Sequence, residues 1–344
     1  MLDPQKIAEW KQFLQANPEK IQEEKEVIQK FGSLFNPANL DNLTKEAFKS
    51  FLLFRNNKHW DGIHRQSTII TADMEKLKKA LKILLDETRD IKERLDILFP
   101  PKGENYIKGL GRAIVTPILT VVYPQKYGVF NTKSEQGLEK AGLLPDFKRK
   151  SFSEKYIEIN RVLNEIAQEN GLTLWEMDWV IGSLSTDSIQ MDTENSDPAS
   201  LPKTIGGDTI ENYEDFGLEA HLEDFLVENW DRLDIGKKYN LLEEDGDIVG
   251  QQYITPIGRF DLLAKSKDDK EWLIIELKKG RTSDAVVGQT LRYIAYAREK
   301  LAQAGEIVKG LIIVGEKDDK LVYAIKPVPD ISLMTYKVSF KLEE

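Results

Sequence analysis

Three residues in the final quarter of the chain have the types and spacing that phosphodiester hydrolysis requires. Asp261 lies in the segment Gly-Arg-Phe-Asp-Leu-Leu, and Glu276 and Lys278 lie in the segment Leu-Ile-Ile-Glu-Leu-Lys. Strand side chains alternate between faces, so Glu276 and Lys278 project to one side of an apolar, strand-like run. Carboxylates can hold Mg²⁺ or Mn²⁺, and such an ion activates water and stabilises the reacting phosphate. The pattern predicts a site in which Asp261, Glu276 and the Leu277 carbonyl bind the metal.

The lysine and its surroundings decide between this prediction and a simpler one. Lys278 is predicted to orient or deprotonate the attacking water and to offset phosphate charge. A Glu-x-Lys pair on a strand is more often a solvated charge pair. Here Glu276 lies among apolar residues, where a charge without a partner is costly. Gln289 and Tyr293 follow on one face of the next predicted helix, which favours the catalytic interpretation.

The elements around these residues predict an α/β domain with a mixed sheet flanked by helices. Apolar spacing predicts helices over 218–230 and 284–302. Strands are predicted over 239–244, 247–254, 259–264, 272–278, 310–315, 321–325 and 333–340, the first two joined by a turn at Asp245-Gly246.

The first half of the chain predicts a mostly α-helical domain over residues 1–183. Helical spacing is clear over 73–98 and over 156–170, where Gly171 suits a C-terminal cap. Residues 184–210 are polar, contain proline and glycine, and are predicted to be a linker. The third part, residues 211–344, is the predicted catalytic domain.

Composition limits the class of protein. The 344 residues are 41% hydrophobic and 31% charged, as in ordinary globular proteins, and no run approaches the ~20 apolar residues of a membrane span. The absence of cysteine excludes disulfides and thiolate metal sites, and the N-terminus lacks the layout of a secretory signal, so a cytoplasmic protein is predicted. The net charge of −10 means that DNA contact must use local basic patches.

Three segments together resemble the PD-(D/E)XK nuclease superfamily: Gly258–Leu263, Ile274–Arg281 and Val286–Tyr293. Within it, residues 211–342 are most similar to the C-terminal nuclease domain of the NucS (EndoMS) endonucleases, whose first helix resembles residues 213–230. The resemblance implies a restriction-endonuclease-like fold that cuts DNA with Mg²⁺ or Mn²⁺.

Residue roles are carried over from this resemblance by position. It implies a catalytic core of Asp261, Glu276 and Lys278. The family's Gln-x-x-x-Tyr motif matches Gln289 and Tyr293. Its first-helix acid matches Glu223, with Glu219 as a rival choice. Phe260 stands where the superfamily motif has proline, a departure common in this subfamily. Basic residues near the core are predicted to contact phosphates, although each suits a solvated surface equally well: Arg259, Lys279, Arg281 and Arg292.

Two N-terminal segments predict further DNA contacts. Residues 106–119 resemble a helix-hairpin-helix turn, whose backbone N–H groups bind a phosphate at Lys108, Gly109 and Gly111; tight helix packing is the alternative. Residues 54–66 interleave basic and aromatic groups as in single-strand binding sites: Arg55, Lys58, His59, Trp60 and Arg65. The alternative is a loop whose tryptophan fills the core.

These features lead to three functional hypotheses. Residues 1–183 do not resemble the DNA-binding half of NucS, and segments 54–66, 106–119 and 123–131 resemble N-terminal domains of McrB-type restriction systems. The first hypothesis is therefore a restriction or defence endonuclease, acting as a homodimer because one site cuts one strand. The chain has no P-loop motif, so any NTPase would be a partner subunit. The alternatives are a NucS-like repair endonuclease for mismatched or branched DNA, and a non-catalytic DNA-binding adaptor with a nuclease-like fold.

Overall fold

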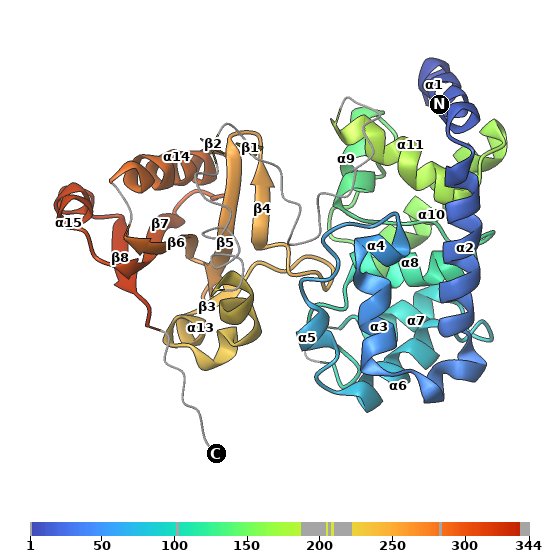
Figure 1. Cartoon of the computed structure of the whole chain (residues 1–344), viewed down its shortest axis with the longest axis horizontal. Helices are drawn as coiled ribbons and strands as arrows, with labels where there is room; N and C mark the ends of the chain where they lie inside the picture. The colour runs from blue at the N-terminus through green and yellow to red at the C-terminus, as the bar shows by residue number, and fades with distance from the viewer. Residues whose placement is uncertain are drawn as a thin grey trace. The chain divides into compact units, whose positions relative to one another are not determined.

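The computed structural model describes residues 2–100, 103–186, 204–205, 208–209, 222–281 and 284–337. The chain divides into two compact units. Unit 1 comprises Met1–Leu201 together with Asp245–Asp247, and unit 2 comprises Pro202–Glu244 and Ile248–Glu344. Figure 1 shows helices in the first unit and a sheet with helices in the second.

Unit 1 is built around helix α8 (Arg112–Val122), which is buried along nearly its whole length. A helix that is apolar on all sides belongs at the centre of a bundle, and α8 continues through Pro117 to Val122. The surrounding helices are α1 (Pro4–Ala16), α2 (Glu19–Leu34), α3 (Lys45–Leu52), α4 (Phe54–Asn57), α5 (Ser67–Ile70), α6 (Met74–Leu84), α7 (Ile91–Leu98), α9 (Thr132–Lys140), α10 (Phe152–Asn170) and α11 (Leu174–Thr186), with a 3₁₀ turn at Pro37–Asn42.

The helical predictions for unit 1 are confirmed with one refinement. The pattern over 73–98 forms two helices, α6 and α7, because Asp90 accepts the Lys92 N–H at 2.7 Å and starts a new helix. Helix α10 ends as predicted, with Gly171 in the left-handed conformation at φ 62°.

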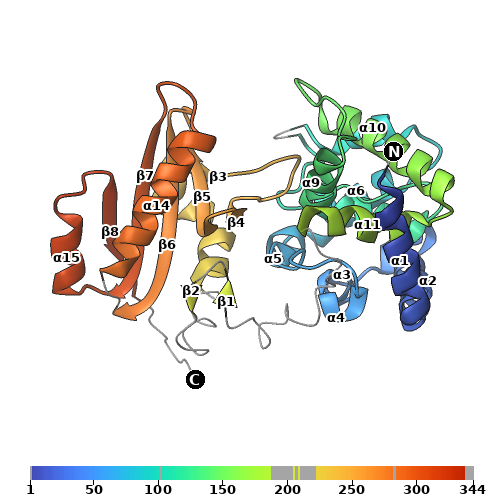
Figure 2. The same ribbon diagram turned by 90° about the horizontal axis from the view of Figure 1, so that it is seen from above.

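The sheet of unit 2 contains the strands β3 (Tyr239–Leu241), β4 (Gln251–Thr255), β5 (Gly258–Ser266), β6 (Glu271–Arg281), β7 (Ile307–Glu316) and β8 (Ile331–Thr335). It is a mixed sheet with strand order β3-β5-β6-β7-β8, in which β4 also pairs with β5. Pairing is antiparallel from β3 and β4 through β6 and parallel from β6 to β8. Helix α14 (Ala285–Lys300) connects β6 to β7 and lies along the sheet (Figure 2). The predicted α/β architecture with a helical N-terminal part is confirmed. The other helical elements of this unit are a helix over 222–228, a 3₁₀ turn at Trp230–Arg232, α13 (Asp234–Lys238) and α15 (Asp319–Ile325).

Some predicted boundaries in this half of the chain change. Residues 321–325 are part of helix α15 and not a strand, because Asp318 accepts the Lys320 N–H at 2.7 Å as an N-cap. The last strand was predicted over 333–340, whereas β8 covers Ile331–Thr335. Residues 338–340 of the prediction and most of the predicted linker lie outside the described residues. The linker's described part contains the end of α11 and the short antiparallel pair β1 (Thr204–Ile205) and β2 (Asp208–Thr209).

The predicted turn at Asp245-Gly246 has φ values of 47° and 86°, as a type I′ turn needs. The strands predicted on either side of it are shorter, because β3 ends at Leu241 and β4 begins at Gln251, and each of them pairs with β5. Across the described ranges, no helix combines the length and apolar character of a bilayer-spanning segment.

The Glu24 carboxylate of α2 accepts a hydrogen bond from Thr173, the residue before α11. Thr173 N–H donates to Glu176 Oε2 at 2.7 Å, and Glu176 N–H donates to Thr173 Oγ1 at 3.1 Å, which forms a reciprocal cap. The Thr173 hydroxyl donates in turn to Glu24 Oε1 at 3.0 Å. Burial raises the pKa of Glu24 to about 7, against the hydrogen bond from Thr173 and together with the nearby Glu176 charge.

We expect Glu24 to make the stability of unit 1 depend on pH. Its pKa rises from 4.5 to about 7 on folding, so its contribution is full below pH 4.5 and is lost as pH rises to 7. Glu24→Gln removes this titration. The free energy of unfolding of the variant relative to wild type should therefore increase by on the order of 1 kcal/mol between pH 5 and pH 8, measured by urea unfolding.

The control for this experiment is Glu26→Gln, which changes an exposed glutamate on the same helix. Its stability should follow that of wild type at both pH values. Parallel pH profiles for Glu24→Gln and wild type would show that Glu24 does not titrate as proposed.

Candidate active site

Asp261 lies where strands β5 and β6 stop pairing through their backbones. The antiparallel register runs from Lys265↔Trp272 to Leu262↔Ile275. At the next position, Asp261 Oδ2 accepts the backbone N–H of Leu277 at 2.7 Å. The Asp261 side chain therefore accepts a hydrogen bond where the backbone pairing of the two strands ends. This bond fixes the carboxylate beside Leu277, the residue after Glu276.

Glu276 and Lys278 lie on the face of the sheet that α14 covers. In the parallel register with β7, Glu276 is level with Ile312 and Lys278 with Val314. Both β7 residues belong to the apolar cluster that includes residues of α14. Glu276 is only 1% exposed, and a carboxylate so far from water is stable only with polar partners or a cation.

The predicted Gln-x-x-x-Tyr pair of α14 lies against the beginning of β5. Gln289 Nε2 donates to the Tyr293 hydroxyl at 3.2 Å, and the Tyr293 ring lies 4.7 Å from that of Phe260. Gly258 has φ +132°, and a Cβ at this position would lie 2.6 Å from the Tyr293 hydroxyl. The bare backbone of Gly258 therefore lets Tyr293 approach the strand that carries Asp261.

The predicted first-helix acid, Glu223, is buried next to strand β4. Gln251 Nε2 donates to Glu223 Oε1 at 3.0 Å, and Gln252 Nε2 donates to Glu223 Oε2. Strand β4 pairs with β5 at Gln251↔Leu262, so this acid is held beside the strand of Asp261. The rival, Glu219, lies outside the described residues.

The oxygen donors at this site suit a hard divalent cation. Among the residues that the structure describes, no group of three or more His, Cys, Asp or Glu side chains is arranged to hold a metal. Asp261, Glu276 and the Leu277 carbonyl supply two carboxylates and one backbone oxygen. Mg²⁺ commonly takes one or two carboxylates and keeps waters or substrate phosphates in its other positions, so the donor set fits Mg²⁺ or Mn²⁺.

The basic residues predicted near the core lie on the same three elements. Arg259 is half-buried on β5, and Lys279 is half-buried on β6. Arg292 is exposed on α14, with its guanidinium 5.3 Å from the Tyr293 ring centre. Arg281 is level with Glu316 of β7. Their contacts with DNA stay predictions.

The structure places the rings of segment 54–66 in the interior of unit 1. Trp60 is 4% exposed, and its Nε1–H donates to Asp178 Oδ2 at 2.9 Å. The same oxygen lies 2.9 Å from His59 Nε2, and burial lowers the pKa of His59 despite this carboxylate. The rings of His59 and Trp60 therefore fill the core of unit 1, as the alternative interpretation proposed, and they do not form an exposed stacking surface. The basic members differ: Arg55 and Lys58 are exposed, and Arg65 is half-buried.

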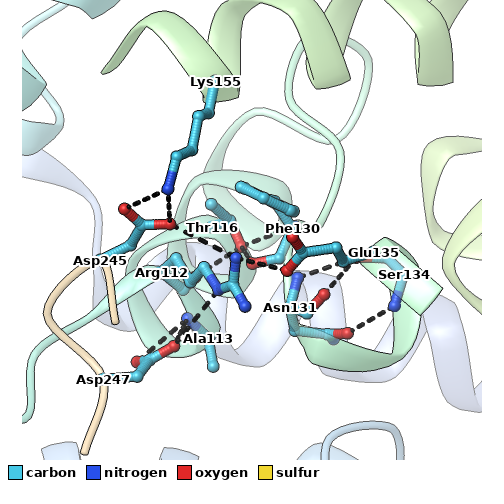
Figure 3. A network of polar contacts seen from close by, with 10 residues as sticks. All are labelled: Arg112, Ala113, Thr116, Phe130, Asn131, Ser134, Glu135, Lys155, Asp245 and Asp247. Carbon is cyan, nitrogen blue, oxygen red and sulfur yellow. Dashed lines mark hydrogen bonds and ion pairs between the residues drawn. The ribbon is translucent and has the colours of Figure 1, made fainter. Parts of the chain in front are cut away.

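The predicted phosphate-binding turn receives a carboxylate from within unit 1. The N-terminus of α8 follows Gly111, and Ala113 N–H donates to Asp247 Oδ2 at 3.0 Å (Figure 3). A Cβ on Gly111 would lie 2.2 Å from the Asp247 backbone nitrogen, so glycine is required for this close approach. Gly109 has φ +81° and Lys108 is half-buried. The N-terminus of α8 thus binds a carboxylate of this chain, and contact of the turn with DNA stays a prediction.

Sequence reasoning missed a buried arginine beside this turn. Arg112 is 2% exposed and forms ion pairs with Glu135 at 2.7 Å and Asp245 at 3.4 Å, while Lys155 pairs with Asp245 at 3.0 Å (Figure 3). No local signal could have found these partners, because they are distant in sequence.

Sequence reasoning also missed Gln251 and Gln252. Adjacent strand residues point to opposite faces, so strand alternation predicts that the two amides lie apart and not at one carboxylate. The doubled glutamine in a strand next to the Asp261 motif was the available signal.

Comparisons with known proteins concern part of unit 2. Residues 218–319 match the family described as Endonuclease NucS C-terminal domain. Endonuclease NucS of Methanocaldococcus jannaschii is 30% identical over 106 residues, which cover 30% of this chain and 36% of that protein. Endonuclease NucS of Sulfolobus acidocaldarius is 30% identical over 97 residues, or 28% and 33% of the two chains. The chain thus spans about a third of the length of these relatives.

Two solved structures are also similar over part of their length. A structure of an EndoMS–dsDNA2 complex is 15% identical, with a TM-score of 0.29, over 36% of this chain and 46% of that chain. A repair endonuclease from Pyrococcus abyssi is 19% identical, with a TM-score of 0.27, over 35% and 46%.

We expect Gly258→Ala to destabilise unit 2 and to displace Tyr293. The substitution adds a methyl group 2.6 Å from the Tyr293 hydroxyl, at a φ of +132° that other residues rarely adopt. The free energy of unfolding should fall by roughly 2 kcal/mol in urea titrations. Gly288→Ala is the matched control: nothing lies within 4 Å of its Cβ on α14, so it should stabilise the helix by about 0.5–1 kcal/mol. Equal stability of the two variants would contradict the proposed packing.

Proposed function

We propose that this protein is a divalent-metal-dependent DNA endonuclease of the PD-(D/E)XK superfamily, with its cleavage site in unit 2. The observation that carries the proposal is the Asp261 carboxylate bound to the Leu277 N–H, one residue after the buried Glu276. The match of residues 218–319 to the NucS C-terminal domain supports the same chemistry.

Each residue of the site has a role in this proposal. Asp261, Glu276 and the Leu277 carbonyl hold Mg²⁺ or Mn²⁺, which supplies an activated water and charge stabilisation at the phosphate when it is bound. Lys278 orients the attacking water or takes its proton, and it offsets charge on the phosphate. The remaining residues, Gln289, Tyr293 and Glu223, support this core from α14 and from the helix over 222–228.

The finer assignment is a restriction or defence endonuclease whose specificity lies in unit 1. Residues 1–201, which make up nearly all of unit 1, lie outside the matched residues 218–319, which supports a DNA reader different from that of the relatives. Duplex cleavage would use a homodimer, one site for each strand, with a further subunit if an NTPase is needed. A NucS-like repair role is the second candidate, because the relatives include two NucS endonucleases.

We expect Glu276→Gln and Lys278→Ala to lower Mg²⁺-dependent DNA cleavage by at least about 100-fold while leaving DNA binding within a few-fold of wild type. The reason is that each change removes a group that acts on the reacting phosphate and not on the bulk of the duplex. Nicking of a supercoiled plasmid measures cleavage, and fluorescence anisotropy with a labelled duplex measures binding.

Two exposed residues provide controls with the same kinds of substitution. Asp269→Asn and Lys270→Ala alter the turn between β5 and β6, at the ends of these strands away from Asp261 and Glu276. Both should cut at the wild-type rate. Equal cleavage by Glu276→Gln, Lys278→Ala and wild type would refute the assignment of the site and would favour a non-catalytic adaptor.

A panel of duplexes separates the two roles. We expect a restriction-type enzyme to cut 5-methylated, hydroxymethylated or glucosylated DNA at a rate different from unmodified DNA, because unit 1 would read the modification. Preferential cutting of mismatched or branched duplexes in the same assay would assign the repair role instead.

A further inference from the structure

Two neighbouring glutamines of β4 bind the same buried carboxylate. Gln251 Nε2 donates to Glu223 Oε1 at 3.0 Å and to Asp224 Oδ1 at 2.9 Å. Gln252 Nε2 donates to Glu223 Oε2. Both oxygens of Glu223 therefore receive an amide hydrogen bond, and Glu223 is 6% exposed.

A regular strand could not make this arrangement. Successive side chains of a strand project to opposite faces, so Gln251 and Gln252 should point away from each other. Gln252 instead has φ +56°, a left-handed conformation that residues with a side chain rarely adopt. Strain of this kind persists only where the surrounding structure enforces it, and it is common at functional sites.

The strained residue lies opposite the proposed metal ligand. The β4–β5 register pairs Gln251 with Leu262 and Tyr253 with Phe260. Gln252 falls between these pairs, level with Asp261. The left-handed backbone of Gln252, which brings its amide to Glu223, therefore lies beside Asp261, which accepts the Leu277 N–H.

We propose that Gln251 and Gln252 are positioning residues of the cleavage reaction, which fix both oxygens of Glu223 beside the Asp261 strand. The inference rests on the proposed function and names two residues that neither the motif nor the family comparison supplies. The amide groups orient a carboxylate without adding a positive charge of their own, so they do not compete electrostatically with a divalent cation. Residues that hold a functional carboxylate in this way typically change metal affinity or activity by 10- to 100-fold when they are lost.

Gln252→Gly tests the proposal without threatening the fold. Glycine removes the amide and adopts a φ of +56° freely, so the relieved backbone strain offsets the lost hydrogen bond to Glu223 and the melting temperature should stay within about 5 °C of wild type. We expect kcat to fall at least about tenfold, the KM for DNA to stay within about twofold, and the dissociation constant for Mn²⁺, measured by calorimetry without DNA, to rise at least about threefold. Gln252→Asn keeps an amide and tolerates the left-handed backbone, so it should recover part of both losses.

Asp269→Gly is the matched control, because Asp269 has a φ of +60° in the exposed turn between β5 and β6. It should relieve the same kind of strain and leave kcat and Mn²⁺ affinity unchanged. Wild-type kcat and Mn²⁺ affinity in Gln252→Gly, with Glu276→Gln inactive, would overturn this inference alone. A lowered melting temperature in Gln252→Gly without recovery by Gln252→Asn would show a purely structural role and overturn it too. Wild-type protein that neither cuts DNA nor binds Mn²⁺ would overturn the proposed function together with it.

Discussion

The hydrogen bond from the Leu277 N–H to Asp261 Oδ2 occurs where two central strands of the sheet cease to pair through their backbones. Strands that diverge leave backbone N–H groups without partners, and a buried N–H must find an acceptor. A carboxylate meets that need and is itself fixed by doing so. The divergence of β5 and β6 thus locates an acid beside Glu276, and the packing of Tyr293 on Gly258 holds the start of β5 in place. The fold of this part of the sheet and the proposed chemistry therefore depend on the same two interactions, the Leu277–Asp261 hydrogen bond and the Tyr293–Gly258 packing.

The sequence predicted what short-range patterns can encode. Alternation and apolar runs gave the strands that carry Asp261 and Glu276, and helical spacing gave α10 and α14. The error at residues 321–325 arose because a short apolar run suits a strand or a helix equally, and the N-cap at Asp318 decided the outcome. The positive φ of Gln252 depends on tertiary contacts, and a residue other than glycine gives no sign of it in the sequence.

The N-terminus of α8 shows a second limit of motifs. A Gly-x-Gly turn before a helix indicates that an anion is bound, because free N–H groups and the helix dipole favour negative charge. It does not say which anion. Here the carboxylate of Asp247 takes the position, and buried Arg112 and Lys155 carry the opposite charges nearby (Figure 3). The acceptor of the Ala113 N–H lies 134 residues further along the chain, so the local motif could not identify it.

The two acidic clusters illustrate different ways to hold a carboxylate. In unit 1, Asp245 is bound by Lys155 and Arg112, whose positive charges make the cluster a closed ion-pair network. In unit 2, the amides of Gln251 and Gln252 orient Glu223 through neutral donors. A cationic partner attracts the carboxylate more strongly, but it also lowers the negative potential that draws in a divalent metal. Amide groups do not titrate, so their own capacity to donate hydrogen bonds does not change with pH. In the proposed metal site, amide donors to Glu223 would thus help to fix a carboxylate without adding positive charge.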